Sequence, residues 1–391
     1  MSTDARERTP WADLARWVVP GVIVFSITVR VVVGISVVAD LADGDSTSGY
    51  IDRFAEIATD PGRPYRDRDV EYPPVSLVAI VLVGTPEEGS TGIRVLWLTL
   101  ALDAAVALSL LWGWGARATA AYLGASLPVL VPMYTTLDLL PVALASWAVA
   151  LAWRRRERAG GALLAAAILA KVWPVVLVPG LVVWGRRRAL AWAVGALAVG
   201  TLLWVSWGGV GALGQVATQR HTPGWEAEST VGAIVWIVGD ERVQNVRDSP
   251  RVGTAPAWAK LALLGATALG VAAVWIRAAR RGAPVEVGAP SLACVAVLLF
   301  CSPIYSYPYV LWLLPWTALA LVEGRRALGW LGVAVIVFTA VTFELLTDGT
   351  VPVQIALVTR NLLTGAIPVV YLVARSNVRT TTAVEPAPTG P

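Results

Sequence analysis

The sequence has 391 residues, of which 56% are hydrophobic and 15% are charged, and its mean hydropathy is +0.65. About a quarter of the residues of a typical soluble domain are charged, so this composition excludes a soluble domain. Together with recurring apolar runs of about twenty residues, it predicts an all-α, polytopic membrane protein. The net charge of +4 does not indicate a nucleic-acid partner, because the basic residues form short arginine runs between apolar segments. The single histidine and the separated Cys294 and Cys301 favour neither a zinc site nor a disulfide.

The N-terminal part predicts a cytoplasmic tail over residues 1–16 and a first helix over Trp17–Ala39, without a cleavable signal. Shorter apolar segments precede the arginine run 154–158, at about 73–85, 94–114, 118–134 and 137–153. Both ends of this set of five segments have cytoplasmic character, so one segment is expected not to cross the membrane. The 73–85 segment is the shortest, about 20 Å as a helix against a hydrocarbon core of about 30 Å.

A hairpin is predicted over residues 161–185, which lie between the arginine runs 154–158 and 186–188. Pro174 interrupts the helical pattern, so we expect two short helices with Lys171 at their tip, deep in the membrane. Together with later segments, the chain predicts a bundle of about ten to thirteen transmembrane or re-entrant helices in one domain, residues 1–375, followed by a disordered cytoplasmic tail over 376–391. The later segments are 189–207, 256–277, 287–302, 308–322, 327–346 and 355–374.

Two long polar loops, 40–72 and 208–255, are expected to share the outer face. The first is rich in carboxylates, which cannot lie in hydrocarbon, and the second carries Arg220 and His221. Carboxylates can accept a proton from an attacking hydroxyl, while cations can hold a phosphate leaving group. An acidic loop that faces a loop with an arginine and a histidine therefore suits a sugar-transfer site.

Four motifs in these segments form a recognisable set. They are Asp45…Tyr50…Gly62-Arg63-Pro64-Tyr65-Arg66-Asp67…Glu71-Tyr72-Pro73-Pro74, Ala170-Lys171-Val172-Trp173-Pro174, Gly224-Trp225-Glu226-Ala227-Glu228-Ser229, and Ser302-Pro303 with Tyr309 to Pro315. Together they resemble glycosyltransferase family 87, over about residues 15–320. Members of this family are GT-C-type membrane enzymes, typical of actinobacteria, that use polyprenyl-phosphate sugars. The sequence departs from the family pattern in the spacing of Asp45 and Tyr50, at Pro223 in place of an arginine and at Ile304 in place of a glutamine.

The resemblance implies an aspartate base in the first loop, and we choose Asp45 over Asp43. Asp45 would deprotonate an acceptor hydroxyl, which attacks the anomeric carbon with inversion as the lipid phosphate departs. No metal or other cofactor is implied. The alternative is that Asp45 only caps a helix that begins near Tyr50.

Substrate-binding roles are expected for eight residues: Arg30, Asp67, Glu71, Tyr72, Lys171, Arg220, His221 and Glu228. Lys171 is the first choice for phosphate, because a lysine within apolar sequence is costly. Lys171 and Arg30 could instead snorkel to the interface, and Asp67 and Glu71 could pair with Arg66 and Arg68. His221 could simply be exposed. Asp138 reads as a helix cap and Asp103 as half of a buried polar pair.

The resemblance implies an enzyme of the plasma membrane with its active site on the extracytoplasmic face. It would move mannose or arabinofuranose from a polyprenyl-phosphate donor to a glycolipid or cell-envelope glycan. The main alternative is a transporter or flippase of lipid-linked sugars, but such proteins build repeats and broken helices around a midplane site. A third reading, a non-catalytic assembly protein, would not need Lys171 or the carboxylates of the first loop.

Overall fold

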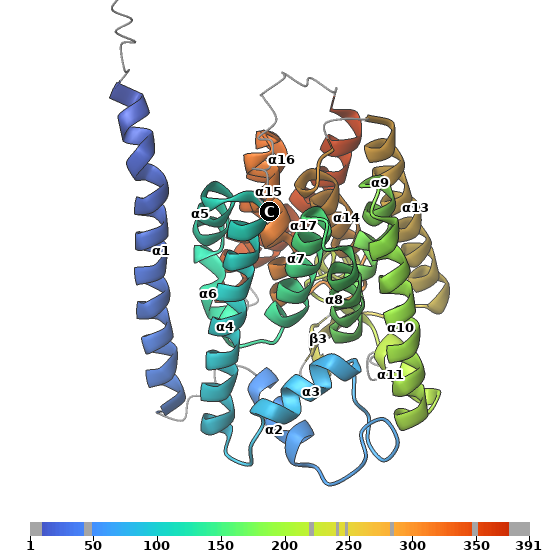
Figure 1. The fold of residues 1–391 in the computed structure, drawn as a ribbon. Helices are drawn as coiled ribbons and strands as arrows, with labels where there is room; N and C mark the ends of the chain where they lie inside the picture. Colours follow the sequence, from blue (N-terminus) through green and yellow to red (C-terminus); the bar gives the residue numbers. More distant parts are fainter. Residues whose placement is uncertain are drawn as a thin grey trace, which may run out of the picture.

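The computed structural model describes residues 10–42, 49–218, 223–239, 242–246, 249–281, 285–345 and 351–374. Within them the chain is almost entirely helical (Figure 1). The elements that precede the second long loop are α1 (Pro10–Ala42), α2 (Gly49–Thr59), α3 (Pro74–Val83), α4 (Glu88–Trp114), α5 (Ala116–Ala125), η1 (Leu127–Val129), α6 (Leu130–Tyr134), α7 (Leu139–Trp153), α8 (Glu157–Ala170), η2 (Trp173–Leu177), α9 (Val178–Val183) and α10 (Arg187–Gly208). After them come α11 (Gly211–Thr218), α12 (Thr230–Val238), α13 (Ala257–Arg281), α14 (Gly288–Phe300), η3 (Tyr307–Leu313), α15 (Leu314–Val322), α16 (Arg326–Leu345) and α17 (Val351–Val373).

Six of the described helices are long and apolar enough to cross a membrane, or seven spans if a bent pair counts as one. Their apolar side chains face outward as well as inward, as in Phe25, Leu203 and Leu264, which are all more than half exposed. A helix that is apolar on every side belongs in lipid, so the predicted all-α polytopic membrane protein is confirmed. The six spans are Trp17–Asp40, Gly89–Trp114, Arg187–Gly208, Ala257–Arg281, Arg326–Phe343 and Val351–Val373.

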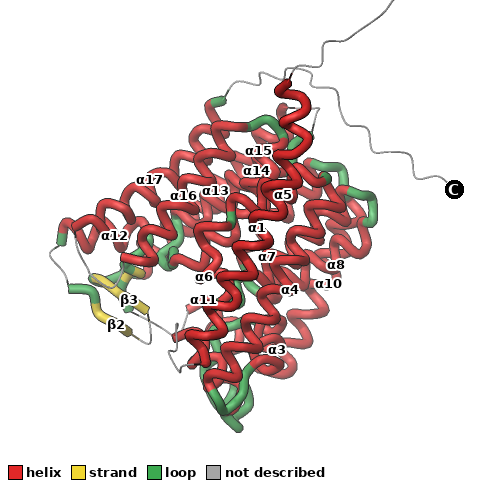
Figure 2. Tube along the Cα trace, turned by 90° about the vertical axis from the view of Figure 1, so that its left-hand side faces the viewer, coloured by secondary structure: helices red, strands yellow, loops and turns green. Residues whose placement is uncertain are grey.

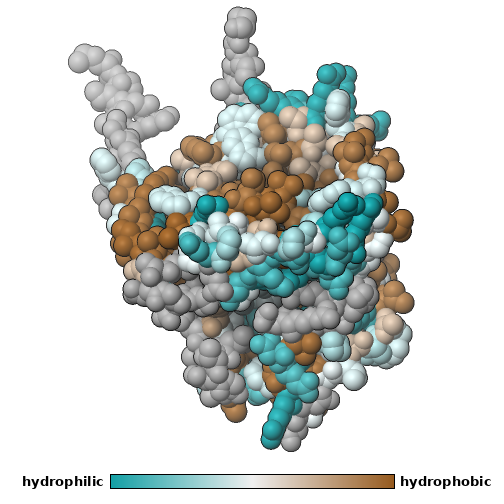
Figure 3. Space-filling model, turned by 90° about the horizontal axis from the view of Figure 1, so that it is seen from below, coloured by the Kyte–Doolittle hydropathy of each residue, from teal (hydrophilic) through white to brown (hydrophobic). Residues whose placement is uncertain are grey.

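The bundle has two ends (Figure 1), whose residues differ in chemistry. One, which we call the loop end, carries α2, α3, α11 and a small sheet. The other, which we call the arginine end, carries the arginine runs 154–158 and 186–188 with Arg281 and Arg325, which both pair with Glu286. Seen from the loop end, hydrophilic side chains form a band between hydrophobic flanks (Figure 3).

Two of the predicted apolar segments do not form one crossing helix. The 73–85 segment, which is the one suspected of not crossing, forms α3, which has ten residues and packs against α2. It lies at the loop end and does not cross the bundle (Figure 2). The 118–134 segment is divided into α5, η1 and α6, and the 127–134 part meets α7 at 117°. Pro128 and Pro132 lie in this broken stretch, where each removes a backbone donor.

The two short helices predicted over 161–185, with Lys171 at their tip, are confirmed, whereas the depth of Lys171 in a membrane stays a prediction. Helix α8 ends at Ala170, Lys171 is extended (φ −158°, ψ 137°), and the chain returns through η2 and α9. The two ends of the hairpin meet, since the Arg188 backbone N–H donates to Glu157 Oε2 at 3.1 Å. Helix α10 packs closely against α8 at Gly161, where an added Cβ would lie 2.1 Å from the Ala189 carbonyl oxygen.

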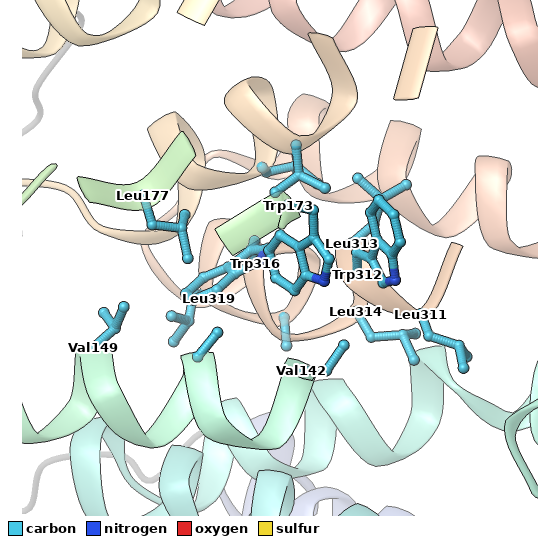
Figure 4. Close-up of a cluster of buried hydrophobic side chains, with 14 of the residues drawn as sticks. Val142, Val149, Trp173, Leu177, Leu311, Trp312, Leu313, Leu314, Trp316 and Leu319 are labelled. Carbon is cyan, nitrogen blue, oxygen red and sulfur yellow. The ribbon is translucent and has the colours of Figure 1, made fainter. Parts of the chain in front are cut away.

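The core of the bundle gathers around tryptophans of the hairpin and of η3 and α15 (Figure 4). Trp173 stacks on Trp312 with ring centroids 5.3 Å apart, and Trp316 is buried beside them over α7. This packing fixes the hairpin tip against η3. The position of Lys171 therefore depends on the core.

The second long loop is more ordered than a loop of polar sequence predicts. It contains α11, α12 and an antiparallel sheet of β1 (Trp225–Glu226), β3 (Ser249–Val252) and β2 (Gln244–Val246), in that order, with Trp225 opposite Val252. Gly224 precedes the first strand at φ 75°, and an added Cβ there would lie 2.8 Å from the Gly253 carbonyl oxygen. Glycine is required at this crossing.

Candidate functional site

The two polar loops meet at the loop end. Tyr65 is buried against Trp204 and Trp207 of α10, with ring centroids 5.6 and 5.8 Å away, and its hydroxyl donates to the Tyr72 carbonyl. Gln215 of α11 donates to the Tyr65 carbonyl and accepts from the Val70 N–H, both at 3.1 Å. The expectation that the loops share one face of the protein is confirmed by these contacts.

Lys171 lies at the hairpin tip inside this end of the bundle. Its Nζ is 2.7 Å from Asp138 Oδ1, 4.3 Å from the centre of the Tyr309 ring and 5.2 Å from that of Trp312. Trp312 Nε1 donates to the same Asp138 oxygen at 2.7 Å. The lysine side chain keeps 25% of its surface accessible. An ammonium held by a carboxylate and two ring faces is a fixed positive charge that a ligand can still reach.

Aromatic side chains connect the first loop to Lys171. Tyr50 of α2 contacts Tyr307 at 6.3 Å, and Phe54 contacts Tyr72 at 5.8 Å between ring centroids. Tyr72 and Asp138 both lie within electrostatic range of the Tyr309 hydroxyl. We call the set around the lysine the lysine site, which consists of Tyr50, Tyr72, Asp138, Lys171, Tyr307, Tyr309 and Trp312. It offers a cation, a carboxylate and aromatic side chains, of which Trp312 is stacked on both faces, by Trp173 and by Tyr309.

The second loop supplies two carboxylates, Glu226 and Glu228. Glu228 is buried, its Oε2 lies 3.0 Å from Arg360 Nη1, and its backbone carbonyl accepts from Asn361 at 3.1 Å. Glu226 lies 3.3 Å from Arg251 Nη2. Burial raises the pKa of Glu226 from 4.5 to about 7, against the opposing effect of Arg251. Glu228 therefore holds the loop to α17 of the bundle, whereas Glu226 connects β1 to β3 within the loop.

The other predicted binding residues make local contacts. Arg30 donates through Nε to Asp103 Oδ2 at 2.7 Å, and this aspartate also accepts from Tyr122 and Tyr134. Asp103 therefore belongs to a buried polar network, as the sequence predicts, and the guanidinium of Arg30 is directed into it.

In the first loop, Glu71 pairs with Arg53 at 3.1 Å rather than with Arg66 or Arg68. Asp67 is exposed and accepts from the Arg63 N–H at 2.9 Å. The structure thus brings Lys171 and Tyr72 to the lysine site, places Glu228 beside it, and holds Arg30 in a separate network. Asp45, Asp43, Arg220 and His221 lie outside the described residues, so their roles stay predictions.

Sequence reasoning missed Arg360 and misread Asp138. Arg360 is fully buried in α17, within the predicted span 355–374, and an arginine there is costly in lipid. That cost is the signal which could have identified it. Asp138 stands at the start of α7, as a cap would, but its side chain makes no capping hydrogen bond and holds Lys171 instead.

Metal binding has no candidate within the described residues, where no three histidine, cysteine, aspartate or glutamate side chains gather closely enough to hold an ion. The groups that the lysine site offers are a cation, a carboxylate, hydroxyls and aromatic faces. This chemistry suits a ligand that is part sugar and part phosphate.

Comparison with known proteins agrees with this chemistry. The family model described as glycosyltransferase family 87 matches residues 71–303, more than half of the chain, including the lysine hairpin, the second loop and part of the Ser302 motif. No curated protein matches the sequence. The chain therefore belongs to glycosyltransferase family 87, and it is a multi-pass membrane glycosyltransferase.

Proposed function

We propose that this glycosyltransferase moves mannose or arabinofuranose from a polyprenyl-phosphate donor to a glycolipid or cell-envelope glycan, at the loop end of the bundle. The observation that carries the proposal is Lys171, a partly accessible cation fixed at the end of a hairpin that is buried among apolar helices. A cation at this place suits a phosphate that arrives on a lipid chain from the bilayer.

The transfer needs one base and one stabilised leaving group. Asp45 accepts the proton of the acceptor hydroxyl, whose oxygen forms the new bond to the anomeric carbon. The bond between that carbon and the phosphate oxygen breaks, and the leaving polyprenyl phosphate takes the electron pair. Lys171 donates to this phosphate while Asp138 and Trp312 hold the ammonium in place. Tyr72 packs on the sugar, and residues 220 and 221 lie in the loop that we assign to donor binding.

The orientation follows from the arginine runs. Arginine-rich turns stay on the cytoplasmic side, so we place the arginine end in the cytoplasm of a cell whose plasma membrane holds the protein, with the loop end outside. The donor then reaches the lysine site from the outer leaflet.

The test uses membrane vesicles that contain the protein and radiolabelled polyprenyl-phosphate mannose or the corresponding arabinofuranose carrier. We expect label in a lipid or glycan acceptor with one donor, and a loss of about a hundredfold or more in Lys171→Met and Asp45→Asn. Lys260→Met, which removes the other lysine of the chain, is the matched control and retains transfer. Asp43→Asn decides between the two candidate bases.

Movement of label across the bilayer without transfer would favour the transporter reading and contradict the proposal. If Lys171→Met transfers sugar at the wild-type rate with either donor, the proposed role of Lys171 in stabilising the leaving phosphate is contradicted.

A further inference from the structure

A cavity opens at the arginine end, at the opposite end of α8 from Lys171. Its volume is about 420 Å³, and it is lined by Arg155, Arg156, Glu157, Arg158, Ala159 and Arg188. Four arginines against one glutamate give the lining a net charge of +3. The 14 residues of α8 span about 21 Å, so this cavity is separate from the lysine site.

The positive charge of this lining is poorly compensated. Among the residues that the structure describes, no carboxylate lies within ion-pair distance of the four lining arginines, which are all exposed. Glu157 uses Oε2 to accept from the backbone N–H of Arg188. Burial and the neighbouring Arg155 lower the pKa of the adjacent Arg186. The excess of positive charge here rests on the four arginines and one glutamate of the lining.

Membrane topology explains why arginines lie in these turns, but not why four of them line one cavity. Like charges that converge repel each other unless an anion lies between them. Helices α8 and α10 also begin here, and Glu157 offsets part of the positive charge of their N-termini, because it lies in the first turn of α8 and accepts from the Arg188 N–H in the first turn of α10.

The surroundings place the cavity at the depth of lipid headgroups. Trp112 packs against Trp147 with ring centroids 5.8 Å apart, and the guanidinium groups of Arg154 and Arg156 lie 5.7 and 5.8 Å from the Trp112 ring. Tryptophan and arginine side chains grouped in this way mark the boundary between hydrocarbon and water. A ligand of the cavity is therefore expected to reach it from the lipid.

We propose that this cavity binds the phosphate of an anionic phospholipid headgroup from the adjacent leaflet. Guanidinium groups bind phosphate oxygens in pairs, and four of them around one space can hold a single phosphodiester from several sides. A volume of about 420 Å³ exceeds what one phosphate ion fills, and it leaves room for the rest of the headgroup.

The test measures lipid binding by the purified full-length protein in detergent, by native mass spectrometry and thermal shift. Short-chain phosphatidylglycerol is the anionic probe and short-chain phosphatidylcholine the neutral one. We expect the wild type to prefer phosphatidylglycerol, and Arg158→Gln with Arg188→Gln to weaken its binding about tenfold or more. Arg158→Lys with Arg188→Lys keeps the charge and retains most of the preference.

The matched control is Arg280→Gln with Arg326→Gln, which removes the same charge from exposed arginines at the same end but outside the cavity. An equal loss of binding in this control would show diffuse attraction and overturn the proposal. Inorganic phosphate that binds as tightly as the lipid would make this a site for soluble anions and overturn the headgroup assignment. If the glutamine variant does not fold, the lysine variant and the phosphate competition still decide.

Discussion

At the scale of single residues, the buried charges of this protein are paired across large sequence distances. Arg30 and Asp103 are 73 positions apart, and Glu228 and Arg360 are 132 apart. A charge inside a membrane bundle is costly unless a partner and further hydrogen bonds satisfy it. A charged residue in an apolar segment therefore predicts that it has a partner, as for Asp103. The sequence does not identify which residue the fold places beside that charge.

The Arg30–Asp103 network predicts a structural role that can be separated from substrate binding. Removal of one charge in Arg30→Met leaves the other buried and unpaired, which costs about 3–5 kcal/mol of unfolding free energy. The double variant Arg30→Met with Asp103→Leu removes both charges and is expected to recover most of that loss. Thermal unfolding in detergent measures both effects. A double variant as unstable as the single one would show that the pairing is not the reason for stability.

Glu226 predicts a pH dependence of stability. Its carboxyl pKa is about 7 in the folded protein against an ordinary 4.5, because burial disfavours the charged form. The folded state thus holds the proton more tightly than the unfolded state. The stabilisation of the folded state by this bound proton is fully present below about pH 4.5 and is lost as the pH rises through about 7. We expect Glu226→Gln to flatten the change of the unfolding midpoint between pH 5 and pH 8. An unchanged slope would contradict the assignment.

At the scale of elements, the hydropathy of the sequence locates the membrane spans. The points where helices break follow from prolines where these are present, and the short strands depend on tertiary contacts. The predicted first helix, Trp17–Ala39, matches the apolar span Trp17–Asp40, although α1 begins earlier, at Pro10, and the predicted 355–374 span covers most of α17. The break at Pro174 follows from the missing N–H of proline. The sheet of the second loop could not be predicted, because its strands have two to four residues and pair only where the loop folds back on itself.

The hairpin predicts a strict size limit at Gly161. Because an added Cβ there would lie 2.1 Å from the Ala189 carbonyl oxygen, Gly161→Ala must push α10 away from α8. We expect a loss of about 1–3 kcal/mol in stability. Gly195→Ala is the matched control, since Gly195 lies on the exposed side of α10 with open space around it. There alanine is expected to be neutral or stabilising. Equal effects of the two variants, measured by thermal unfolding, would contradict the close packing of α8 and α10.

At the scale of the whole molecule, the lysine site is assembled from segments that no sequence window contains. Lys171 comes from the hairpin, Asp138 from the start of α7, Tyr309 and Trp312 from η3, and Tyr50 from α2. The sequence could identify Lys171 by its cost in apolar surroundings. It could not identify Asp138, because an aspartate before a helix is usually a cap, and only the packing of Trp173 on Trp312 brings the lysine to it.

The two ends of the bundle predict a defined accessibility in cells. In a protein with Cys294→Ala and Cys301→Ala, Arg63→Cys places one thiol at the exposed loop end and Arg326→Cys places one at the exposed arginine end. We expect a membrane-impermeant maleimide to label Arg63→Cys on intact cells, and Arg326→Cys only after permeabilisation, because arginine-rich turns stay in the cytoplasm.

The reverse labelling pattern would place the lysine site on the cytoplasmic face and contradict a donor that arrives from the outer leaflet. Labelling of both thiols on intact cells would contradict the separation of the two ends. Because the lysine site and the arginine-lined cavity lie at opposite ends of α8, this one experiment also assigns the leaflet that each of them faces. A sugar-transfer site that meets the outer leaflet then requires a headgroup site that meets the inner one.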